Sequence, residues 1–530
     1  MEEKKLKLLP LGKQIFSEII KKNNLYIDKT EEIYKLFENG EKYYFLSRPR
    51  MFGKSLLVST LESIFNGEKE LFKNLWIYNK IDFKKYPVIK LTMNDLIYSE
   101  GVKGFKNSLL DQINDIYKIY NIRLESTNHK IAFKNLIHEL AKIEKVVLLI
   151  DEYDKPIINY IESNKLEIAK EIKEILREFY ETIKANDKYL HFVFLTGVSK
   201  FSKTSVFSTL NNLTDMTTNE KYAKILGIEE EDVHGYFKEE IKILGKKYNE
   251  NEEEIKSGLK KWYNGYSWNG KDFLYNPYSL LLLFENNEIK NYWSNTGTPD
   301  FLIKIIKDRE INLKELENIV LDEINFESYD INNMNIYALL FQTGYLTIKE
   351  VMYKGYEKKY VLSYPNMEVK ESFLNLVLKE FSINKNDFKS IKISNLIEVL
   401  KKDDIKEFIE VIKTIYADIP YDIFINDQEK YYSTVLYLIV SLMGTKITAE
   451  MEVKTHRNAS QQGRIDAVIE TDTSIFIFEF KIGSANKAME QIEEKKYYEK
   501  YLGGIKKIFL VGVGFSTKKK NIYSYVIKNK

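Results

Sequence analysis

Short runs of apolar residues alternate with amphipathic stretches over the first part of the chain. The apolar runs lie at residues 43–48, 87–93, 146–151 and 192–198. Most contain no polar alternation, which is typical of strands buried on both faces of a parallel sheet. Helical patterns separate them, for example at residues 54–65. This order predicts an α/β domain over residues 1–215.

The pattern changes twice further along the chain. Residues 216–394 are predicted to be mostly helical, with charged amphipathic runs, aromatic clusters and a short hairpin at residues 344–362. From residue 395 a helical stretch precedes three strands, a helix and a further strand. We therefore expect three parts: an α/β domain, a helical middle region, and a second α/β domain over residues 395–530.

Composition narrows the function classes. The chain has 530 residues, of which 44% are hydrophobic and 30% charged, and this balance excludes wholesale disorder. Its 80 basic and 78 acidic residues give a net charge of only +2, so the chain as a whole lacks the strong positive charge that is typical of nucleic-acid binders. Cysteine is absent, which excludes disulfides and thiolate zinc sites and fits a cytoplasmic protein. No apolar run is long enough for a membrane helix, so we expect no membrane partner.

A candidate phosphate-binding loop follows the first strand. The segment reads Ser47-Arg-Pro-Arg-Met-Phe-Gly-Lys-Ser55 and leads into a helical pattern. In such a loop backbone N–H groups cradle the phosphates, a lysine reaches the β and γ oxygens, and a hydroxyl binds Mg²⁺. Gly53, Lys54 and Ser55 fit these roles, whereas Arg48 occupies the place where the usual pattern has its first glycine. The alternative is an ordinary strand-to-helix turn.

A second element favours the nucleotide interpretation. The apolar strand at residues 146–151 ends in Asp151 and Glu152. Asp151 is expected at the ligand-binding edge of the sheet, where it can hold Mg²⁺, and Glu152 can polarise the attacking water. The alternative is an acidic helix cap. One predicted strand lies between this element and the phosphate loop, as the additional-strand class of P-loop ATPases requires. The predicted cofactors are therefore ATP and Mg²⁺.

Five further residues are candidates for contact with the nucleotide: Arg48, Arg50, Thr196, Ser199 and Lys200. The strand at residues 192–198 contains Thr196 and is followed by Ser199 and Lys200, and a polar residue at this strand end senses the γ-phosphate in such ATPases. The alternative is a plain turn. Arg50 lies within the phosphate loop and faces either the phosphates or a neighbouring subunit.

A different constellation stands near the C-terminus. Glu479 and Lys481 are two residues apart on a predicted strand, so they share one face, and Asp466 lies on the preceding strand. A carboxylate pair of this kind binds Mg²⁺ or Mn²⁺, which can activate water for attack on a phosphodiester. Lys481 can orient that water or stabilise the transition state. The alternative is a surface Glu-x-Lys pair, although the apolar strand around it disfavours a solvated edge.

Neighbouring residues extend this second constellation. Gln491 and Tyr497 or Tyr498 on the following helix are candidates to line the same cleft, and Glu429 is a candidate third carboxylate. The last 50 residues are rich in lysine, which suits either a nucleic-acid backbone or a solvated face.

Taken together, the motifs resemble a bacterial family that joins an AAA-ATPase-like domain to a C-terminal PD-(D/E)XK nuclease-superfamily domain. The segments that carry the resemblance are Tyr26-Ile-Asp-Lys-Thr30, Phe45-Leu-Ser-Arg-Pro-Arg-Met-Phe-Gly-Lys-Ser55, Ile150-Asp-Glu-Tyr-Asp154, Trp262-Tyr-Asn-Gly-Tyr266, Gln342-Thr-Gly-Tyr-Leu346, Gly463-Arg-Ile-Asp466 and Glu479-Phe-Lys481. In that family arginine is usual at position 48, whereas Met51 departs from a frequent basic residue.

The resemblance implies ATP binding by Gly53, Lys54 and Ser55, with Asp151 and Glu152 as the hydrolytic acids. It also implies a nuclease-type site of Asp466, Glu479 and Lys481 in a restriction-endonuclease-like fold. Because Tyr26 and Asp28 lie shortly before the phosphate loop, we expect them to contact the adenine or to shape its pocket. The family implies no particular substrate.

The sequence thus predicts an ATPase coupled to a metal-dependent nuclease that acts on DNA, in defence or in the handling of mobile elements. Its expected partners are ATP, nucleic acid and further copies of the chain. The main alternative is a regulatory ATPase whose nuclease-like domain only binds nucleic acid or a protein. A scaffold that binds no nucleotide is the third possibility.

Overall fold

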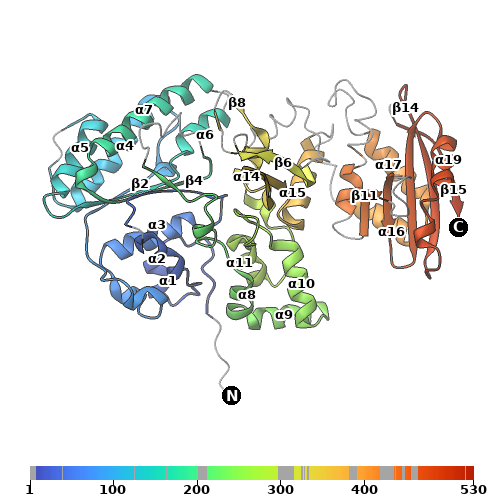
Figure 1. Ribbon diagram of the computed structural model, residues 1–530, viewed down its shortest axis with the longest axis horizontal. Helices are drawn as coiled ribbons and strands as arrows, with labels where there is room; N and C mark the ends of the chain where they lie inside the picture. The colour runs from blue at the N-terminus through green and yellow to red at the C-terminus, as the bar shows by residue number, and fades with distance from the viewer. Residues whose placement is uncertain are drawn as a thin grey trace, which may run out of the picture. The chain divides into compact units, whose positions relative to one another are not determined.

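The computed structural model describes residues 7–38, 40–123, 126–162, 165–200, 212–296, 316–323, 326, 329–330, 333–380, 391–417, 435, 437–443, 448–454, 464–519 and 521–530. Contacts along the chain divide it into two compact units (Figure 1). The first comprises Met1–Leu302 with Leu316–Val369, and the second comprises Lys370–Lys530 with Ile303–Glu315. The division places residues 1–215 and most of the middle region in one unit, and the three-part division stays a prediction.

The first unit is organised around a parallel sheet. Its strands are β1 (Tyr43–Ser47), β2 (Val88–Thr92), β3 (Val146–Asp151), β4 (Leu190–Gly197) and β5 (Thr214–Asp215). They lie in the order β2-β3-β4-β1-β5, and every pairing is parallel. The α/β class predicted from the apolar runs is thus confirmed. Because the strands are parallel, the residues that follow β1, β3 and β4 gather at one edge of the sheet.

Helices cover both faces of this sheet. They are α1 (Phe16–Lys21), α2 (Thr30–Glu38), α3 (Lys54–Phe65), α4 (Gly101–Ile119), α5 (His129–Leu140), α6 (Lys155–Glu162) and α7 (Leu166–Ala185). Figure 1 shows α1 to α3 on one face and α4 to α7 on the other. All residues of β3 are buried, as expected for a central strand between two helical layers.

The remainder of the first unit combines helices with a small antiparallel sheet. The helices are α8 (Glu230–Tyr236), α9 (Lys238–Tyr248), α10 (Glu252–Tyr263), α11 (Pro277–Asn286), α14 (Ile336–Gln342) and α15 (Met367–Glu380), of which α15 runs into the second unit. The strands are β6 (Ile319–Asp322), β9 (Thr347–Lys354) and β10 (Glu357–Ser363), with a separate pair β7 (Tyr329–Asp330) and β8 (Asn333–Met334). The predicted hairpin at residues 344–362 is found as β9 and β10.

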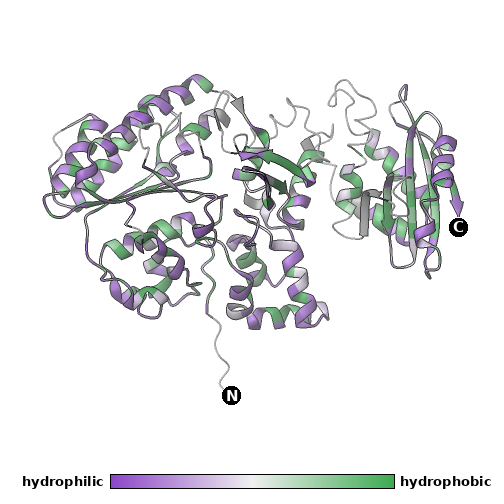
Figure 2. Cartoon of the chain, in the orientation of Figure 1, coloured by the Kyte–Doolittle hydropathy of each residue, from purple (hydrophilic) through white to green (hydrophobic). Residues whose placement is uncertain are grey.

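The second unit contains a mixed sheet in the order β11-β12-β13-β14-β15. Its elements are α16 (Ile391–Lys401), α17 (Ile405–Ala417), β11 (Thr448–Lys454), β12 (Arg464–Glu470), β13 (Ser474–Ile482), α19 (Ala485–Lys495), β14 (Lys507–Ser516) and β15 (Asn521–Asn529). Only β13 and β14 pair in parallel. Figure 2 shows the central strands of this sheet as largely hydrophobic.

Alternation along β13 assigns its two faces to different neighbours. Phe478 packs against Phe408 of α17, with ring centroids 5.4 Å apart. Ile477 on the opposite face packs with Met489 and Ile492 of α19. The acidic residue next to Phe478 therefore lies on the α19 face.

Short 3₁₀ turns complete the described structure: η1 (Lys69–Phe72), η2 (Trp76–Asn79), η3 (Met93–Asp95), η4 (Asp187–Tyr189), η5 (Glu220–Tyr222), η6 (Trp293–Thr296) and η9 (Glu499–Tyr501). Within the described ranges, no helix is both long and apolar enough to cross a bilayer.

Candidate functional site

The loop between β1 and α3 has the geometry of an anion-binding turn. Gly53 stands at the N-cap of α3 with φ +91°, a left-handed conformation that glycine adopts without strain. The free N–H groups of the first turn of α3 begin directly after it. Lys54 is 6% exposed, and its Nζ donates to the backbone carbonyls of Arg48 (2.9 Å) and Pro49 (2.8 Å). The ammonium group therefore lies on the inner side of the loop.

Acidic residues face this lysine from the end of β3. Burial lowers the pKa of Lys54, while the charges of Asp151, Glu152 and Asp154 raise it. Asp151 is 4% exposed, and its Oδ1 has no hydrogen-bond partner among the described residues. An unpaired buried carboxylate oxygen is costly unless a ligand completes it. Asp151, together with the hydroxyl of Ser55 in the first turn of α3, fits a Mg²⁺ bound between protein and phosphate.

Glu152 has an unusual backbone conformation. Its φ is +54°, in the left-handed region that residues with a Cβ rarely adopt. Burial is the main cause that raises the pKa of this carboxyl, and Lys54 opposes the shift. Strain of about 1–3 kcal/mol at one residue is commonly retained where it serves a site. A carboxylate whose pKa is raised by burial is a stronger base than an exposed one, which suits it to accept a proton from water.

Residues at the end of β4 are hydrogen-bonded to neighbouring parts of the chain. Thr196 is fully buried, and its Oγ1 donates to the Leu46 carbonyl at 2.9 Å. The backbone N–H of Ser199 donates to Asp154 Oδ2 at 2.6 Å, and the Ser199 carbonyl accepts from the Tyr153 hydroxyl. Thr196 and Ser199 thus lie at the predicted edge, and the hydroxyl of Thr196 already has a protein partner. Asp154, which ends one of the motifs but was given no role of its own, accepts hydrogen bonds from the backbone N–H groups of Val198 and Ser199 at this strand end.

Arg48 lies beneath the phosphate loop. It is 1% exposed, its guanidinium carbon lies 4.0 Å from the centre of the Trp268 ring, and its Nη1 donates to the Ser47 and Thr217 carbonyls at 2.9 Å. Burial lowers the pKa of Arg48 to about 9. A contact with phosphate would require Arg48 to leave these partners, so its described contacts indicate an anchor for the loop. The charge of Arg50 acts on Lys54, which places Arg50 near the site.

An apolar cavity of about 110 Å³ lies beside Gly53. Its lining includes Tyr26, Ile27, Lys29, Phe52, Leu57, Leu226 and Gly227. A narrow apolar slot next to a phosphate loop fits a planar base. Tyr26 therefore lines the cavity beside the phosphate loop, and its contact with an adenine stays a prediction, whereas the Asp28 carboxylate accepts from the backbone N–H groups of Thr30 and Trp76. The segment that contributes Leu226 and Gly227 lies more than 170 residues after the loop, and no motif indicated it.

The second site is built by the hairpin of β12 and β13. Ala467 pairs with Phe478, so continuation of this register sets Asp466 opposite Glu479. Asp466 Oδ2 accepts the Phe480 N–H at 2.9 Å, and Glu479 Oε1 lies 3.4 Å from Lys481 Nζ. The side chain of Glu479 is 1% exposed, whereas that of Lys481 is 40% exposed. The structure therefore brings the three predicted residues together, with the carboxylate inside and the lysine at the rim.

The surroundings of Glu479 raise the pKa of its carboxyl, so a cation that binds there must displace a proton near neutral pH. Burial is the main cause that raises its pKa to about 7, the charge of Asp466 adds to this, and Lys481 opposes it. Its Oε2 is buried without a partner among the described residues. On α19, Gln491 Nε2 donates to Glu479 Oε1 and to the Tyr497 hydroxyl (3.3 Å). Of the residues predicted to line the cleft, Gln491 thus contacts the buried carboxylate directly, and Tyr497 is linked to it through Gln491.

Two glycines in β14 allow α19 to approach the sheet closely. Gly512 pairs with Glu479 and Gly514 with Lys481. A Cβ at Gly512 would lie 2.6 Å from the Ala485 carbonyl oxygen, and one at Gly514 would lie 2.7 Å from the Ala485 nitrogen. Any larger residue would push α19 away and withdraw Gln491 from Glu479. The alternation Val511-Gly-Val-Gly-Phe515 was the available signal in the sequence.

The donors fit a divalent cation that shares its shell with substrate. Within the described ranges there is no group of three or more acidic or histidine side chains arranged to hold a metal ion. Asp466 and Glu479 supply two carboxylates, and the unpaired Oε2 of Glu479 is a suitable hard ligand. Phosphate oxygens and water would complete the shell. Glu429, the candidate third carboxylate, lies outside the described residues.

Comparison with known proteins agrees with both constellations. Residues 10–207 match a family described as a predicted AAA-ATPase, and residues 427–525 match the PD-(D/E)XK nuclease superfamily. The chain is also 33% identical to an uncharacterised protein in the vnfD 5' region of Azotobacter chroococcum mcd 1, over 99% of both chains. The chain belongs to the family of that protein, in which an AAA-ATPase-like domain is joined to a C-terminal PD-(D/E)XK nuclease-superfamily domain. The predicted family is thereby confirmed.

Proposed function

We propose that the protein binds and hydrolyses ATP and uses the nucleotide cycle to control a metal-dependent nuclease acting on DNA. The observation that carries the proposal is a buried carboxylate oxygen at each site, Asp151 Oδ1 and Glu479 Oε2, that has no hydrogen-bond partner in the part of the chain that the structure describes and lies near a lysine. Unpaired acceptors of this kind indicate groups that bind a cation with the substrate. The fitting biological role is defence against foreign DNA or the handling of mobile elements, in the cytoplasm.

In the ATPase half, Gly53 and the first turn of α3 bind the phosphates and Lys54 neutralises their charge. Ser55 and Asp151 hold Mg²⁺, and Glu152 accepts the proton of the attacking water. The apolar cavity beside Gly53 takes the adenine. Arg50 and Ser199 contact the γ-phosphate, whereas Arg48 and Thr196 hold the loop and the strand end through their buried hydrogen bonds.

In the nuclease half, Asp466 and Glu479 bind Mg²⁺ or Mn²⁺ through oxygen ligands. The metal supplies Lewis-acid stabilisation of the phosphodiester when it is bound. Lys481, which is partly exposed at the rim, contacts the scissile phosphate or its attacking water. Gln491 positions Glu479 through the hydrogen bond from α19.

One observation favours a second function. The described residues place only two carboxylates at the nuclease-type site, and the pKa of one of them is raised to about 7. Both features weaken metal binding at neutral pH. A regulatory ATPase whose C-terminal domain binds nucleic acid or a protein without cleaving it is therefore the alternative.

Incubation of the purified protein with circular single- and double-stranded DNA, with Mn²⁺ or Mg²⁺ and with or without ATP, tests the proposal. Cleavage together with ATP turnover is expected. Turnover without cleavage would favour the regulatory ATPase, and the absence of both would refute the proposal. Lys481→Ala separates the two functions further. If the domain is a nuclease, this variant should lose cleavage and still bind DNA. If the domain only binds a partner, the variant should keep its function.

A further inference from the structure

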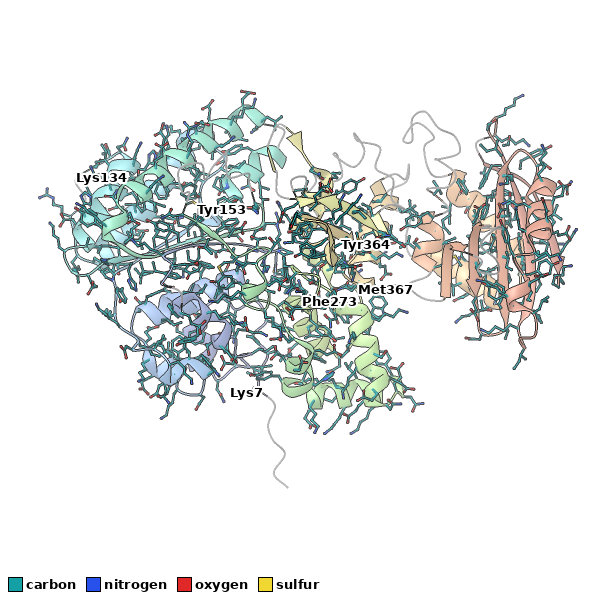
Figure 3. All side chains as sticks on the ribbon, viewed as in Figure 1. Lys7, Lys134, Tyr153, Phe273, Tyr364 and Met367 are labelled. Atoms are coloured by element: carbon teal, nitrogen blue, oxygen red, sulfur yellow. The ribbon has the colours of Figure 1, made fainter. Side chains whose placement is uncertain are left out.

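A second pocket lies in the first unit, distinct from the cavity beside Gly53. Its volume is about 500 Å³, and no residue is shared between the two linings. Loops and ends of α8, α10 and β9 form it, with Phe273 (Figure 3) as an apolar wall that is 38% exposed. Pockets of this size commonly take a small organic ligand.

The charges around this pocket are unbalanced. Its acidic residues are largely paired: Glu229 with Lys224 at 2.7 Å, and Glu230 with Lys260 at 2.7 Å. By contrast, no described carboxylate lies within ion-pair distance of Lys349 or of Lys261, although both line the pocket. Glu231 also lines the pocket without an ion pair among the described residues and offsets one of these two charges, so a net positive charge of about one is left for a ligand to neutralise.

Lys349 is the central group. It lies on β9 and is only partly exposed, its Nζ donates to the Pro365 carbonyl at 2.9 Å, and it lies 5.8 Å from the centre of the Phe273 ring. An ammonium group has three protons to donate, and a partly buried one gains most from an anionic acceptor. Burial lowers its pKa to about 8, in keeping with an environment that lacks a negative charge.

The floor of the pocket contains Gly265, which lies in a sequence motif to which neither the ATPase site nor the nuclease-type site assigns a role. Gly265 belongs to the segment Trp262-Tyr-Asn-Gly-Tyr266 and has φ +118°. A Cβ there would lie 2.0 Å from the Pro365 carbonyl oxygen and 3.4 Å from Lys349 Nζ. Any other residue would thus displace the lysine and the carbonyl that holds it. The close packing indicates that this floor is built around the lysine.

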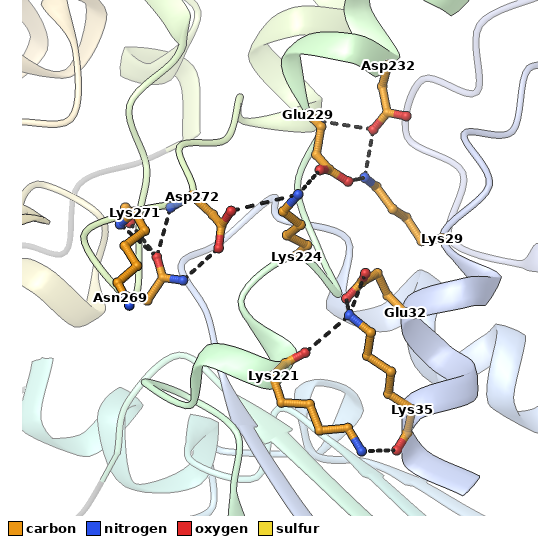
Figure 4. A network of polar contacts seen from close by, with 11 residues as sticks. Lys29, Glu32, Lys35, Lys221, Lys224, Glu229, Asp232, Asn269, Lys271 and Asp272 are labelled. Carbon is orange, nitrogen blue, oxygen red and sulfur yellow. Dashed lines mark hydrogen bonds and ion pairs between the residues drawn. The ribbon is translucent and has the colours of Figure 1, made fainter. Parts of the chain in front are cut away.

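Ion pairs connect this pocket with the nucleotide cavity. Lys224 pairs with Glu229 and lies 3.7 Å from Asp272, and all three residues line the pocket. Glu229 also accepts from Lys29, which lines the cavity beside Gly53 (Figure 4). An anion that attracts Lys224 would compete for it with Glu229, so the two cavities share one set of charges.

We propose that the pocket around Lys349 and Gly265 is a second ligand site, separate from the ATP site, for a small phosphate-bearing anion. Lys349 is its principal phosphate contact, Lys261 adds charge at the mouth, and Phe273 offers a face for a ring attached to the phosphate. Binding at such a site would let a metabolite or a nucleotide product change the activity of the ATPase.

Titration calorimetry of the full chain carrying Lys54→Ala tests this site while binding at the phosphate loop is weakened. The probes are sodium pyrophosphate and AMP, which separate recognition of phosphate alone from recognition that includes a ring. We expect saturable binding of at least one probe, and about a tenfold or greater loss of affinity in Lys349→Ala, because a charge-assisted contact is removed. Lys354→Ala, on the same strand, is the matched control and should leave affinity unchanged.

Gly265→Ala provides a second variant that keeps the charge and closes the floor, and it should weaken the same probe. Thermal unfolding of each variant checks that the fold is retained. The ATP affinity of Lys349→Ala and of Gly265→Ala, each also prepared with Lys54 intact, gives a second check. Absence of saturable binding by both probes, or equal affinity in Lys349→Ala and Lys354→Ala, would overturn the proposal. Neither result would affect ATP binding at Lys54.

Discussion

The two constellations differ most in how they hold their lysine. In the first, Lys54 is 6% exposed and donates to carbonyls of its own loop. In the second, the side chain of Lys481 is 40% exposed and lies 3.4 Å from a carboxylate that is itself buried. An enclosed lysine suits a small ligand that enters a shaped site, whereas a lysine at a sheet rim suits a polymer that lies across it.

The difference extends to the surroundings. The phosphate loop is held from below by Arg48 on Trp268 and bordered by an apolar cavity. The nuclease-type site is held by one face of α19, through Gln491. The first site is therefore preorganised by many contacts, and the second by few. We expect substitutions at the second site to affect chemistry with little effect on folding.

The largest effect is expected for Lys481→Ala. Loss of the group that stabilises charge at the phosphate should reduce cleavage about 10²–10³-fold, by analogy with the removal of other transition-state donors. ATP affinity should stay unchanged. The measurement is the rate of DNA cleavage with Mn²⁺, with Lys495→Ala as control because that residue is exposed on α19. Equal rates in the two variants would contradict a catalytic role.

The next largest effect is expected for Lys54→Ala. Removal of a buried positive charge that faces the phosphates should weaken ATP binding about 100-fold, which corresponds to about 2.7 kcal/mol. The exposed Lys73 offers a control in the same unit. Fluorescent-nucleotide titration gives both affinities. If Lys54→Ala binds ATP as tightly as Lys73→Ala does, the loop is an ordinary turn.

A smaller effect concerns pH at the nuclease-type site. The pKa of Glu479 is raised to about 7, so below that pH its carboxyl is mostly neutral and must release a proton before it binds a cation. Mn²⁺ affinity should therefore fall about tenfold per pH unit below pH 7 and level off above it. Calorimetry at pH 6, 7 and 8 measures this. Affinity that does not change over the range would show that Glu479 is not a ligand.

The smallest effect is expected for Gln491→Ala. Loss of one hydrogen bond to Glu479 should cost about 0.5–1.5 kcal/mol, or about two- to tenfold in Mn²⁺ affinity. The residue positions the ligand and does not bind the metal, so the same substitution should leave the pH dependence in place. Glu490→Ala on the exposed face of α19 is the control. A loss as large as that of Glu479→Gln would instead make Gln491 a direct ligand.

Local pattern was enough to predict much of this architecture. Apolar runs marked β1, β2, β3 and β4 because these strands are buried on both faces, and alternation placed Glu479 and Lys481 on one face of β13. The two-residue strand β5 was missed, since it is too short to show a pattern. Residues brought together across long sequence separation were also missed, such as Leu226 beside Gly53. Such contacts depend on tertiary packing that no local window contains.

The side-chain partner of Arg48 illustrates the same limit. The position of Arg48 in the loop predicted a contact with the nucleotide, but the stacking partner Trp268 lies 220 residues further along the chain. In a chain whose basic residues are mostly lysine, an arginine at this position was a sign that a planar guanidinium was needed. The sequence alone did not distinguish an arginine that binds a ligand from an arginine that stabilises the fold.

The central claim is that one chain couples nucleotide turnover to DNA cleavage. The most direct test compares Mn²⁺-dependent cleavage of circular DNA by the unmodified protein, Lys54→Ala and Lys481→Ala, each with and without ATP. The account predicts that ATP changes the rate in the unmodified protein, that Lys54→Ala cleaves without responding to ATP, and that Lys481→Ala does not cleave. Cleavage that is retained in Lys481→Ala, or an ATP response that persists in Lys54→Ala, would contradict it.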